Sequence, residues 1–551
     1  MNQLHKSKPL LWCLLLAFTA ITLYMLGVRT LVPPDEGRYA EMAREMFVSG
    51  DWITTRLNGI KYFEKPPLQT WMNALTFAAF GVGEWQARLW TGLCGLLGVA
   101  LTAHAGAKLF GARVGLYAAL VLASSLFWSA AGQIDSLDMG LAAMMTLSLA
   151  GLLLAQRDGA GAAGRRNWML ACWAGMALAV LSKGLIGLVL PGAVLVLYTL
   201  AARDWAIWGR LHLAKGALLF FAIAAPWFVL VALNNPEQPH FFFIHEHVER
   251  FLLKTHHREG AWYYFVPLLL VGVMPWLTLL PHSLAAALRR APGAFQPKLL
   301  LLVWAAFIVV FFSCSSSKLP GYIVPVFPAL ALLIALQLET ASRRGHMLCA
   351  ALVALLGAAA LVAVPLAIQG SQRPPAELLP LKAYEPWLLA AAFVLLAGGA
   401  LALLRARQAR RDVTVLTLAC AGFLATHLIL AGFEPYGRLR AGVALLPQIR
   451  AELGPATTIY SVGTYEQALT FYLGRTVTLV DYSDEFEFGL RQQPALARDV
   501  DAFVAQWRAD AQAGVRDLAI LRPDYYAKLR LRGVPMRVVA QDSRRMVVAN
   551  R

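Results

Sequence analysis

The feature that most constrains this chain is a series of long apolar runs, each about as long as the thickness of a lipid bilayer requires. In chain order they cover residues 10–28, 87–107, 113–131, 139–156, 168–182, 184–202, 215–233, 262–283, 299–314, 320–338, 347–368, 386–404 and 413–432. A backbone inside hydrocarbon must satisfy its hydrogen bonds within its own segment, so runs of this kind predict helices. The sequence therefore predicts a mainly α polytopic membrane protein with about 13 spans, of which the fifth and sixth are the hardest to separate.

The basic residues predict which helix ends face the cytoplasm. The net charge is +17, but Lys and Arg fall mostly in short loops, where they orient helices and contact anionic lipids, so nucleic-acid binding is not predicted. Alternate loops carry Lys108 and Arg113; Arg157, Arg165 and Arg166; Arg203 and Arg210; Arg289 and Arg290; Arg343 and Arg344; and Arg405, Arg407, Arg410 and Arg411. Together with Lys6 and Lys8 they mark one cytoplasmic side, and an odd number of spans places the C-terminus outside.

The opposite side receives the residues suited to chemistry. The stretch Leu31–Lys65 is dense in charged and aromatic residues, although only 15% of the whole chain is charged. Ionisable residues held against a membrane are costly unless they have a task, so this stretch is predicted to form part of a functional site. Within it, Tyr39–Phe47 has helical spacing and predicts a helix lying along the membrane interface. Its apolar stripe would consist of Tyr39, Met42, Ala43 and Met46.

The composition changes after residue 432. Predicted strands and helices alternate over residues 433–551, a rhythm that indicates a small α/β domain on the outer side. We therefore divide the chain into a transmembrane domain, residues 1–432, with a first outer loop at about 29–86, and an outer α/β domain, residues 433–551. No glycine-rich fingerprint follows the first strand of the outer domain, so no nucleotide cofactor is predicted.

Two adjacent carboxylates, Asp35 and Glu36, follow Pro33-Pro34 where the chain leaves the first helix. One carboxylate could act as a general base toward an acceptor, or both could hold a metal. The alternative is a simple helix start, with Asp35 as the N-cap and Glu36 favoured by the helix dipole. Local spacing leaves these readings open.

A second pair of charges, Glu64 and Lys65, is held before Pro66-Pro67 and could bind a cation and an anion side by side, or form an ordinary surface ion pair. Farther along, the segment Phe241–Phe251 contains His245 and His247, two positions apart. This spacing does not fit an HExxH zinc helix. A metal site that combines a histidine with Glu64 remains open, and so does an amphipathic interfacial helix.

Single charges stand at predicted helix ends on the outer side. Lys183 lies between two apolar runs, where a substrate anion or a partner carboxylate would make an ammonium tolerable. Asp135, Asp138 and Lys318 have similar positions. Lysines and arginines that converge at one membrane face are suited to phosphate recognition, whereas snorkelling to the head groups is the alternative for any one of them.

These motifs resemble a known family. The order Pro-Asp-Glu-Gly-Arg-Tyr-Ala-Glu-Met-Ala-Arg at 34–44, then Phe-Glu-Lys-Pro-Pro at 63–67, resembles the bacterial GT-C glycosyltransferases of the 4-amino-4-deoxy-L-arabinose (aminoarabinose) lipid A transferase family. Ser-Lys-Gly at 182–184, Glu-His-Val-Glu-Arg-Phe at 246–251 and Ser-Lys-Leu-Pro-Gly-Tyr at 317–322 look like later motifs of that family. The motifs are shared with near relatives, including protein O-mannosyltransferases, and do not fix the sugar.

The resemblance implies an inner-membrane enzyme with the GT-C fold and a periplasmic site. It would transfer aminoarabinose, with inversion, from undecaprenyl phosphate to lipid A phosphates, and so give resistance to polymyxin and cationic peptides. The expected partners are this lipid-linked donor, lipid A and membrane lipids, and a monomer is expected. Asp35 would be the catalytic base or would activate the acceptor phosphate. Lys183 would assist at the carrier phosphate, and Asp138 would contact the donor amine or support the site.

The same resemblance implies substrate-binding and metal-binding residues. The substrate-binding set is Arg38, Tyr39, Tyr62, Lys65, Arg250, Lys318 and Tyr322. Lys65 and Arg250 would bind the carrier phosphate. Glu64 and His245 would be candidate ligands for a divalent ion, zinc or magnesium or manganese, with His247 as an alternative to His245.

Besides a non-catalytic assembly subunit, for which changes to Asp35 or Lys65 would not reduce lipid A modification, two other functions remain as alternatives. One is a GT-C transferase that uses another polyprenyl-linked sugar and a protein or glycan acceptor. The other is a lipid or sugar transporter, for which paired broken helices and internal symmetry would be expected. The chain shows neither pattern, and its charges gather at one face, so the sequence favours the transferase.

Overall fold

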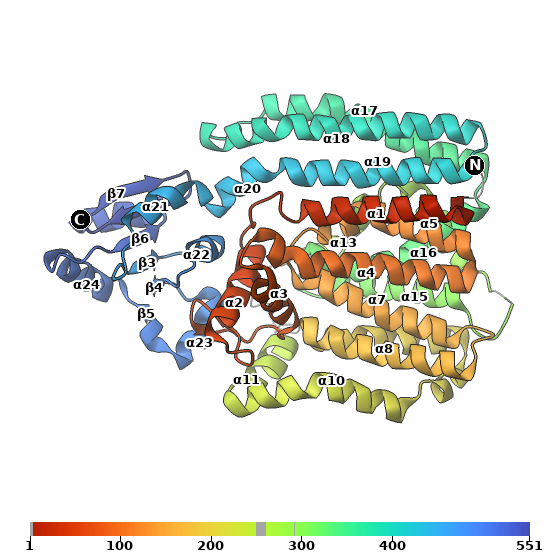
Figure 1. Ribbon diagram of the computed structural model, residues 1–551, viewed down its shortest axis with the longest axis horizontal. Coiled ribbons are helices and arrows are strands. Elements are labelled where there is room, and N and C mark those ends of the chain that lie inside the picture. The colour runs from red at the N-terminus through yellow and green to blue at the C-terminus, as the bar shows by residue number, and fades with distance from the viewer. Residues whose placement is uncertain (1–3, 250–259, 291) are drawn as a thin grey trace.

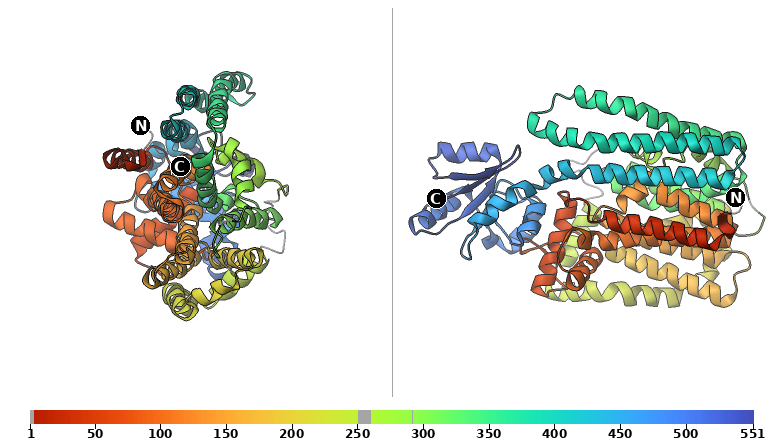
Figure 2. Two further views of the ribbon diagram at one scale, coloured as in Figure 1. Left: turned by 90° about the vertical axis from the view of Figure 1, so that its right-hand side faces the viewer. Right: turned by 45° about the horizontal axis from the view of Figure 1, so that its top comes forward.

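The computed structural model describes residues 4–249, 260–290 and 292–551. Figure 1 shows a long helix bundle with a smaller α/β domain at one end, and the two marked termini lie at opposite ends of the molecule. The view from the end in Figure 2 shows the bundle helices running side by side. This arrangement confirms the predicted polytopic helical fold with an α/β domain.

The bundle is built from apolar helices, most of them long and a few of them short. They are α1 (Lys8–Met25), α4 (Glu84–Phe110), α5 (Ala112–Ser124), α6 (Leu126–Ala131), α7 (Leu137–Gln156), α8 (Ala162–Lys183), α9 (Ile186–Ala202), α10 (Leu213–Asn234), α13 (Phe265–Gly272), α14 (Leu280–Ala287), α15 (Pro297–Cys314), α16 (Phe327–Thr340), α17 (Arg343–Gln369), α18 (Pro375–Arg407) and α19 (Arg411–Gly432). Each predicted apolar run falls on one of these helices or on two consecutive ones. The described part of the chain holds nine helices long and apolar enough to cross a membrane singly.

The remaining apolar runs are less regular. In the described residues, the helical pair Phe265–Gly272 and Leu277–Ala287 is bent by 113°, and α5 and α9 are shorter apolar helices. The total of about 13 spans therefore stays a prediction. The connections α7–α8, α9–α10 and α18–α19 lie at the end of the bundle where the N-terminus is marked (Figure 1), so several of the arginine-rich loops do share one end.

The bundle is centred on α7, which is 89% buried over its most apolar window. Its contact with α8 is close because of a glycine: a Cβ at Gly175 would lie 2.6 Å from the backbone nitrogen of Ser148. Small residues allow helix backbones in a membrane to approach in this way. Because α7 begins at Leu137 and α8 ends at Lys183, this packing brings the outer ends of both helices together.

Short elements cover the outer end of the bundle. They are α2 (Asp35–Ser49), β1 (Arg56–Leu57), β2 (Ile60–Lys61), α3 (Leu68–Phe80), α11 (Gln238–His240) and the π-helix η3 (Phe241–Glu249). Figure 1 shows α2, α3 and α11 between the long helices and the α/β domain. The predicted stripe of α2 is buried at all four positions, but it lies against protein, including α22 of the outer domain, and not against lipid head groups.

The outer domain follows two linking helices, α20 (Glu434–Ala441) and α21 (Leu446–Glu452). Its strands are β3 (Ile459–Val462), β4 (Thr478–Val480), β5 (Ala497–Arg498), β6 (Leu518–Leu521), β7 (Arg537–Gln541) and β8 (Met546–Ala549), in the sheet order β5-β4-β3-β6-β8-β7. The first four strands of that order run parallel to one another, and β8 pairs antiparallel with both β6 and β7. Its helices are α22 (Gln467–Leu473), α23 (Glu487–Gln492), α24 (Val500–Gln512) and α25 (Pro523–Leu531).

The outer domain is seated directly on the first outer loop. A Cβ at Gly37 of α2 would lie 2.5 Å from the backbone nitrogen of Ala468 in α22, so the two helices touch through backbone. The side chain of Asn58, in the turn between β1 and β2, donates to the carbonyl of Val477 at 2.8 Å and accepts from its N–H at 2.7 Å. These contacts join the loop and the domain into one surface.

The contact at Gly37 leads to a stability prediction. In an open helix, a Gly→Ala change stabilises by about 1 kcal/mol, because alanine loses less backbone freedom on folding. At Gly37 the added methyl group meets the backbone of α22, so we expect Gly37→Ala to destabilise the protein by about 1–3 kcal/mol instead. The measurement is the thermal unfolding midpoint of the purified protein in detergent.

The matched control is Gly164→Ala in α8, where nothing lies within 4 Å of the added methyl group. The control is expected to keep or raise the unfolding midpoint. An equal rise for both variants would contradict the close contact between α2 and α22.

Candidate active site

Asp35 is the first residue of α2 and stays half-exposed, with 53% of its side chain accessible. A carboxylate at this position is favoured by the partial positive charge of the helix N-terminus. Its charged neighbour is Arg38, one turn later, whose Nη1 lies 3.2 Å from Oδ1 of Asp35. Asp35 is thus both accessible and held near a cation at the outer end of the bundle.

Glu36 has the opposite environment and is fully buried. Its Oε1 accepts from Nε of Arg88 at 2.6 Å and from the N–H of Asp135 at 3.0 Å, while Oε2 accepts from the N–H of Val32 at 2.8 Å. Burial alone would raise the pKa of Glu36, but the guanidinium groups of Arg88 and Arg29 lower it to about 2. Both oxygens are engaged, so the alternative in which Asp35 and Glu36 together hold a metal is not supported.

Arg88 explains why α2 begins where it does. Besides Glu36, this buried guanidinium donates to the carbonyls of Leu26 and Arg29 at 2.8 and 2.7 Å, and to that of Thr30 at 2.9 Å. Arginine carries five donors in a rigid fork, which suits it to several fixed acceptors at once. It therefore joins α4 to both the end of α1 and the start of α2.

The sequence predicted Asp135 only as a single charge at a helix end, whereas the structure shows it buried and hydrogen-bonded to side chains of α3. Its carboxyl group accepts from Nε2 of Gln69 at 2.7 Å and from Nδ2 of Asn73 at 3.0 and 3.1 Å. Burial and the nearby Glu36 raise its pKa well above the usual value, against these amide donors and Arg88. Gln69 and Asn73, the two amide side chains of α3, stand four residues apart and so share one helix face, a sequence signal for a buried polar partner that was missed.

Arg38 links Asp35 to the outer domain. Its Nε lies 2.6 Å from Oε2 of Glu485, and both side chains are largely buried. Glu485 lies in the short helix η7 (Asp484–Phe486) of the outer domain, 447 positions after Arg38 in the sequence. The sequence offered no signal for this pairing, because the approach of the two segments depends on the docking of the domains.

Two buried tyrosines lie beside these charges. Burial raises the pKa of Tyr39 well above its usual value, and the carboxylates of Asp35, Glu64 and Asp138 add to that effect against Arg38. Burial likewise raises the pKa of Tyr62, with Glu64 adding to the effect. Several of the predicted residues are thus within electrostatic range of one another at the outer end.

Asp138 and Lys183 form an ion pair between the start of α7 and the end of α8. The ammonium of Lys183 also lies 4.7 Å from the ring centroid of Tyr322, a cation–π contact. A Cβ at Gly321 would overlap with the carboxylate of Asp138, so the segment η5 (Pro320–Val326) closes over the pair. Three predicted residues from separate elements therefore meet here.

The predicted metal ligands line a polar cavity, and Lys65 is hydrogen-bonded to two of the residues around it. Nζ of Lys65 donates to Oε2 of Glu246 at 2.8 Å and to the carbonyl of Glu64 at 2.7 Å. A cavity of about 260 Å³ is lined by Glu64, His245 and Glu246 together with Glu485 and other residues of the outer domain. The structure thus brings Glu64 and His245 to one cavity.

A metal ion is not thereby established. Carboxylate and imidazole groups suit zinc, but within the described ranges no three His, Cys, Asp or Glu side chains are placed to hold one ion. The segment of His245 is wound as a π-helix, so side-chain spacings expected for an α-helix do not apply there. Arg250 and the side chain of His247 lie outside the described residues. The divalent ion stays a prediction.

Lys318 has a local task. Its ammonium donates to the carbonyls of Ser313 and Ser315, at 3.0 and 2.6 Å, at the C-terminal end of α15. A lysine in this position satisfies unpaired carbonyls and complements the negative end of the helix dipole. The structure does not place Lys318 in contact with the other predicted site residues that it describes.

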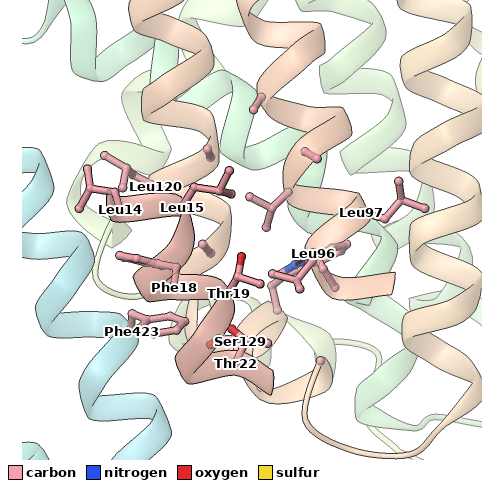
Figure 3. A pocket seen from close by; sticks show the side chains of 18 of the residues that line it. Leu14, Leu15, Phe18, Thr19, Thr22, Leu96, Leu97, Leu120, Ser129 and Phe423 are labelled. Atoms are coloured by element: carbon pink, nitrogen blue, oxygen red, sulfur yellow. Dashed lines mark hydrogen bonds between the residues drawn. The ribbon is translucent and has the colours of Figure 1, made fainter. Parts of the chain in front are cut away.

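An apolar cavity of about 450 Å³ lies away from these charges, between α1, α4 and α5. Figure 3 shows Leu14, Leu15 and Phe18 of α1 and Leu96 of α4 around it, with Phe423 at one side. No charged side chain of the described residues lines it. Its chemistry suits hydrocarbon, and the polar site is elsewhere.

Comparisons with known proteins agree over almost the whole chain. Residues 445–550 match the family model of the aminoarabinose transferase C-terminal domain, and residues 10–242 match that of dolichyl-phosphate-mannose-protein mannosyltransferase. The undecaprenyl phosphate-alpha-4-amino-4-deoxy-L-arabinose arabinosyl transferase of Pseudomonas aeruginosa (strain UCBPP-PA14) is 35% identical over 392 residues, which are 68% of this chain and 69% of that one.

Another protein with this name, from Aeromonas salmonicida (strain A449), is 33% identical over 332 residues, and the match spans 59% of each chain. A solved structure, ArnT from Cupriavidus metallidurans bound to undecaprenyl phosphate, is 41% identical, covers 99% of both chains and superposes with a TM-score of 0.93. The motifs, the fold and these matches lead to one conclusion. The chain belongs to the family of undecaprenyl phosphate-alpha-4-amino-4-deoxy-L-arabinose arabinosyl transferases, which have the GT-C glycosyltransferase fold.

Proposed function

We propose that this protein transfers 4-amino-4-deoxy-L-arabinose from undecaprenyl phosphate to phosphate groups of lipid A, with inversion at the sugar. The reaction would take place at the periplasmic face of the bacterial inner membrane and would give resistance to polymyxin and other cationic peptides. The proposal is supported by the names of the relatives and by the undecaprenyl phosphate in the Cupriavidus metallidurans structure. The arginine-rich loops support the orientation, because such loops remain in the cytoplasm.

The observation that carries the proposal is that an accessible carboxylate and a largely buried ammonium lie at the same end of the bundle. Asp35 stands beside Arg38, and Lys183 is paired with Asp138 under Tyr322. The buried phenol of Tyr39 is within electrostatic range of both Asp35 and Asp138. Neighbouring side chains can therefore contact both a phosphate-linked donor and an acceptor.

Departure of the carrier phosphate is the step that cations assist. As the bond between the sugar and the phosphate breaks, negative charge grows on the phosphate oxygens, and preorganised cations stabilise that charge strongly in a dry site. Lys183 is 13% exposed and is held by Asp138, so it is oriented before substrate arrives. Lys65, held by Glu246, is the second cation for this role.

Attack by the acceptor is the step that Asp35 assists. A lipid A phosphate is already nucleophilic near neutral pH, so a half-exposed carboxylate would orient it and take its remaining proton. The donor amine is cationic, and the carboxylates of Asp138 and Glu64 could distinguish it from a neutral sugar. A metal at Glu64 and His245 is a further proposal, on which none of these steps depends.

The substitution Asp35→Asn tests the function directly. It keeps the shape of the side chain but removes the charge, and loss of a positioned base lowers rates by about 100-fold or more. We expect a strain that lacks its own transferase to make lipid A carrying aminoarabinose with the wild-type gene and almost none with the variant. Mass spectrometry of extracted lipid A is the measurement.

Asp524→Asn is the matched control, since this aspartate is about half-exposed in the outer domain and pairs only with a neighbouring arginine among the contacts described. It should support wild-type levels of modification. Full modification by Asp35→Asn would overturn the catalytic role. The match of residues 10–242 to a protein mannosyltransferase model favours peptide acceptors as a second candidate, and wild-type glycosylation of peptides without lipid A modification would establish it.

A second substitution, Lys183→Gln, tests donor binding. Removal of the ammonium leaves the carrier phosphate without this largely buried cation, so we expect the KM for the undecaprenyl-linked donor to rise by about ten-fold or more. The measurement is initial-rate kinetics with purified protein. Lys215→Gln, an exposed lysine in the first turn of α10, is the control and should leave the KM unchanged. Equal KM values for Lys183→Gln and wild type would exclude the role.

A further inference from the structure

Arg38 stands between two carboxylates that come from different domains. Its Nη1 lies 3.2 Å from Asp35, and its Nε lies 2.6 Å from Glu485, the second contact being an ion pair outside hydrogen-bond geometry. The exposed fractions of the side chains are 53% for Asp35 and only 8% for Glu485. Water screens the exposed contact far more than the buried one, so Glu485 dominates the position of the guanidinium.

Glu485 is itself fixed by the seating of the outer domain. Its Oε1 accepts from Nε2 of Gln467 at 2.7 Å, and Gln467 is the first residue of α22. The next residue, Ala468, is the one whose backbone lies against Gly37 of α2. The close contact between the two helices therefore sets Glu485 over Arg38, one residue beyond the glycine.

We propose that Glu485 is a positioning residue of the transfer reaction, which holds the guanidinium of Arg38 partly away from Asp35 and so leaves the Asp35 carboxylate accessible. The site is then complete only when the outer domain is docked on α2. The inference rests on the proposed function, because it assigns Asp35 a part in the chemistry. Without the charge of Glu485, Asp35 would be the one carboxylate left in the described ion pairs of Arg38, and the guanidinium would cover it.

The test is Glu485→Gln, which keeps the size of the side chain and its acceptor for Gln467 but removes the charge. In purified protein with the lipid-linked donor and lipid A, we expect kcat to fall about ten-fold or more, because small displacements of a reacting group are costly. The KM for the donor should change by less than about two-fold, since the cations proposed for the carrier phosphate are untouched. The unfolding midpoint should stay close to that of wild type.

Glu452→Gln is the matched control. Glu452 forms ion pairs with Arg516 and Arg537 of the outer domain. The Glu452→Gln variant should therefore keep the wild-type kcat. The variant Arg38→Gln completes a double-mutant cycle with Glu485→Gln. If Glu485 acts through Arg38, the double variant should be no slower than Arg38→Gln alone.

Three results would overturn the inference. They are a wild-type kcat for Glu485→Gln, a lower unfolding midpoint with an unchanged kcat per folded molecule, and additive losses in the cycle. These results are distinct from failure of the proposed function, in which wild-type protein itself would not modify lipid A. If both the wild-type enzyme and the Glu485→Gln variant modify lipid A at the same rate, only the positioning role of Glu485 is excluded.

Discussion

The buried pair of Arg88 and Glu36 is the constraint on which the outer end of the molecule depends. A buried charge is costly unless it is fully paired, and removal of one partner leaves the other stranded. Here the pair is embedded in further hydrogen bonds to the end of α1, to Thr30 in the link before α2, and to the turn at Asp135. The position of Asp35, one residue before Glu36, follows from this junction.

Two neighbouring carboxylates are thereby given opposite tasks. Glu36 is buried and held ionised, with a pKa of about 2, whereas Asp35 is half-exposed. Glu36 fastens α2 to the bundle, whereas Asp35 stays accessible beside Arg38. The outer domain adds a third carboxylate, Glu485, which reaches back to Arg38. A membrane bundle and a soluble domain thus build one polar site at their junction.

Much of the fold could be predicted from the sequence, because hydropathy and strand–helix rhythm are local signals. The apolar runs all fall on helices, and the alternation of strands and helices predicted after residue 432 is observed as an α/β domain. Contacts between residues far apart in the sequence could not be predicted in this way. Glu36 meets Arg88 across 52 positions and Glu485 meets Arg38 across 447, and only packing decides such contacts. The family resemblance assigned Asp138 and Lys183 to one site, but it did not reveal that they form an ion pair or that Lys318 binds the carbonyls at the end of α15.

The most direct test of this account uses purified wild-type protein in lipid nanodiscs, with undecaprenyl phosphate-linked aminoarabinose as donor. Lipid A and a serine- and threonine-rich peptide would be offered together as acceptors, and both would be followed by mass spectrometry. The account predicts that lipid A gains the mass of an aminoarabinose, that undecaprenyl phosphate is released in equal amount, and that the peptide is unchanged. Sugar on the peptide with unmodified lipid A would contradict it, as would intact donor after full incubation.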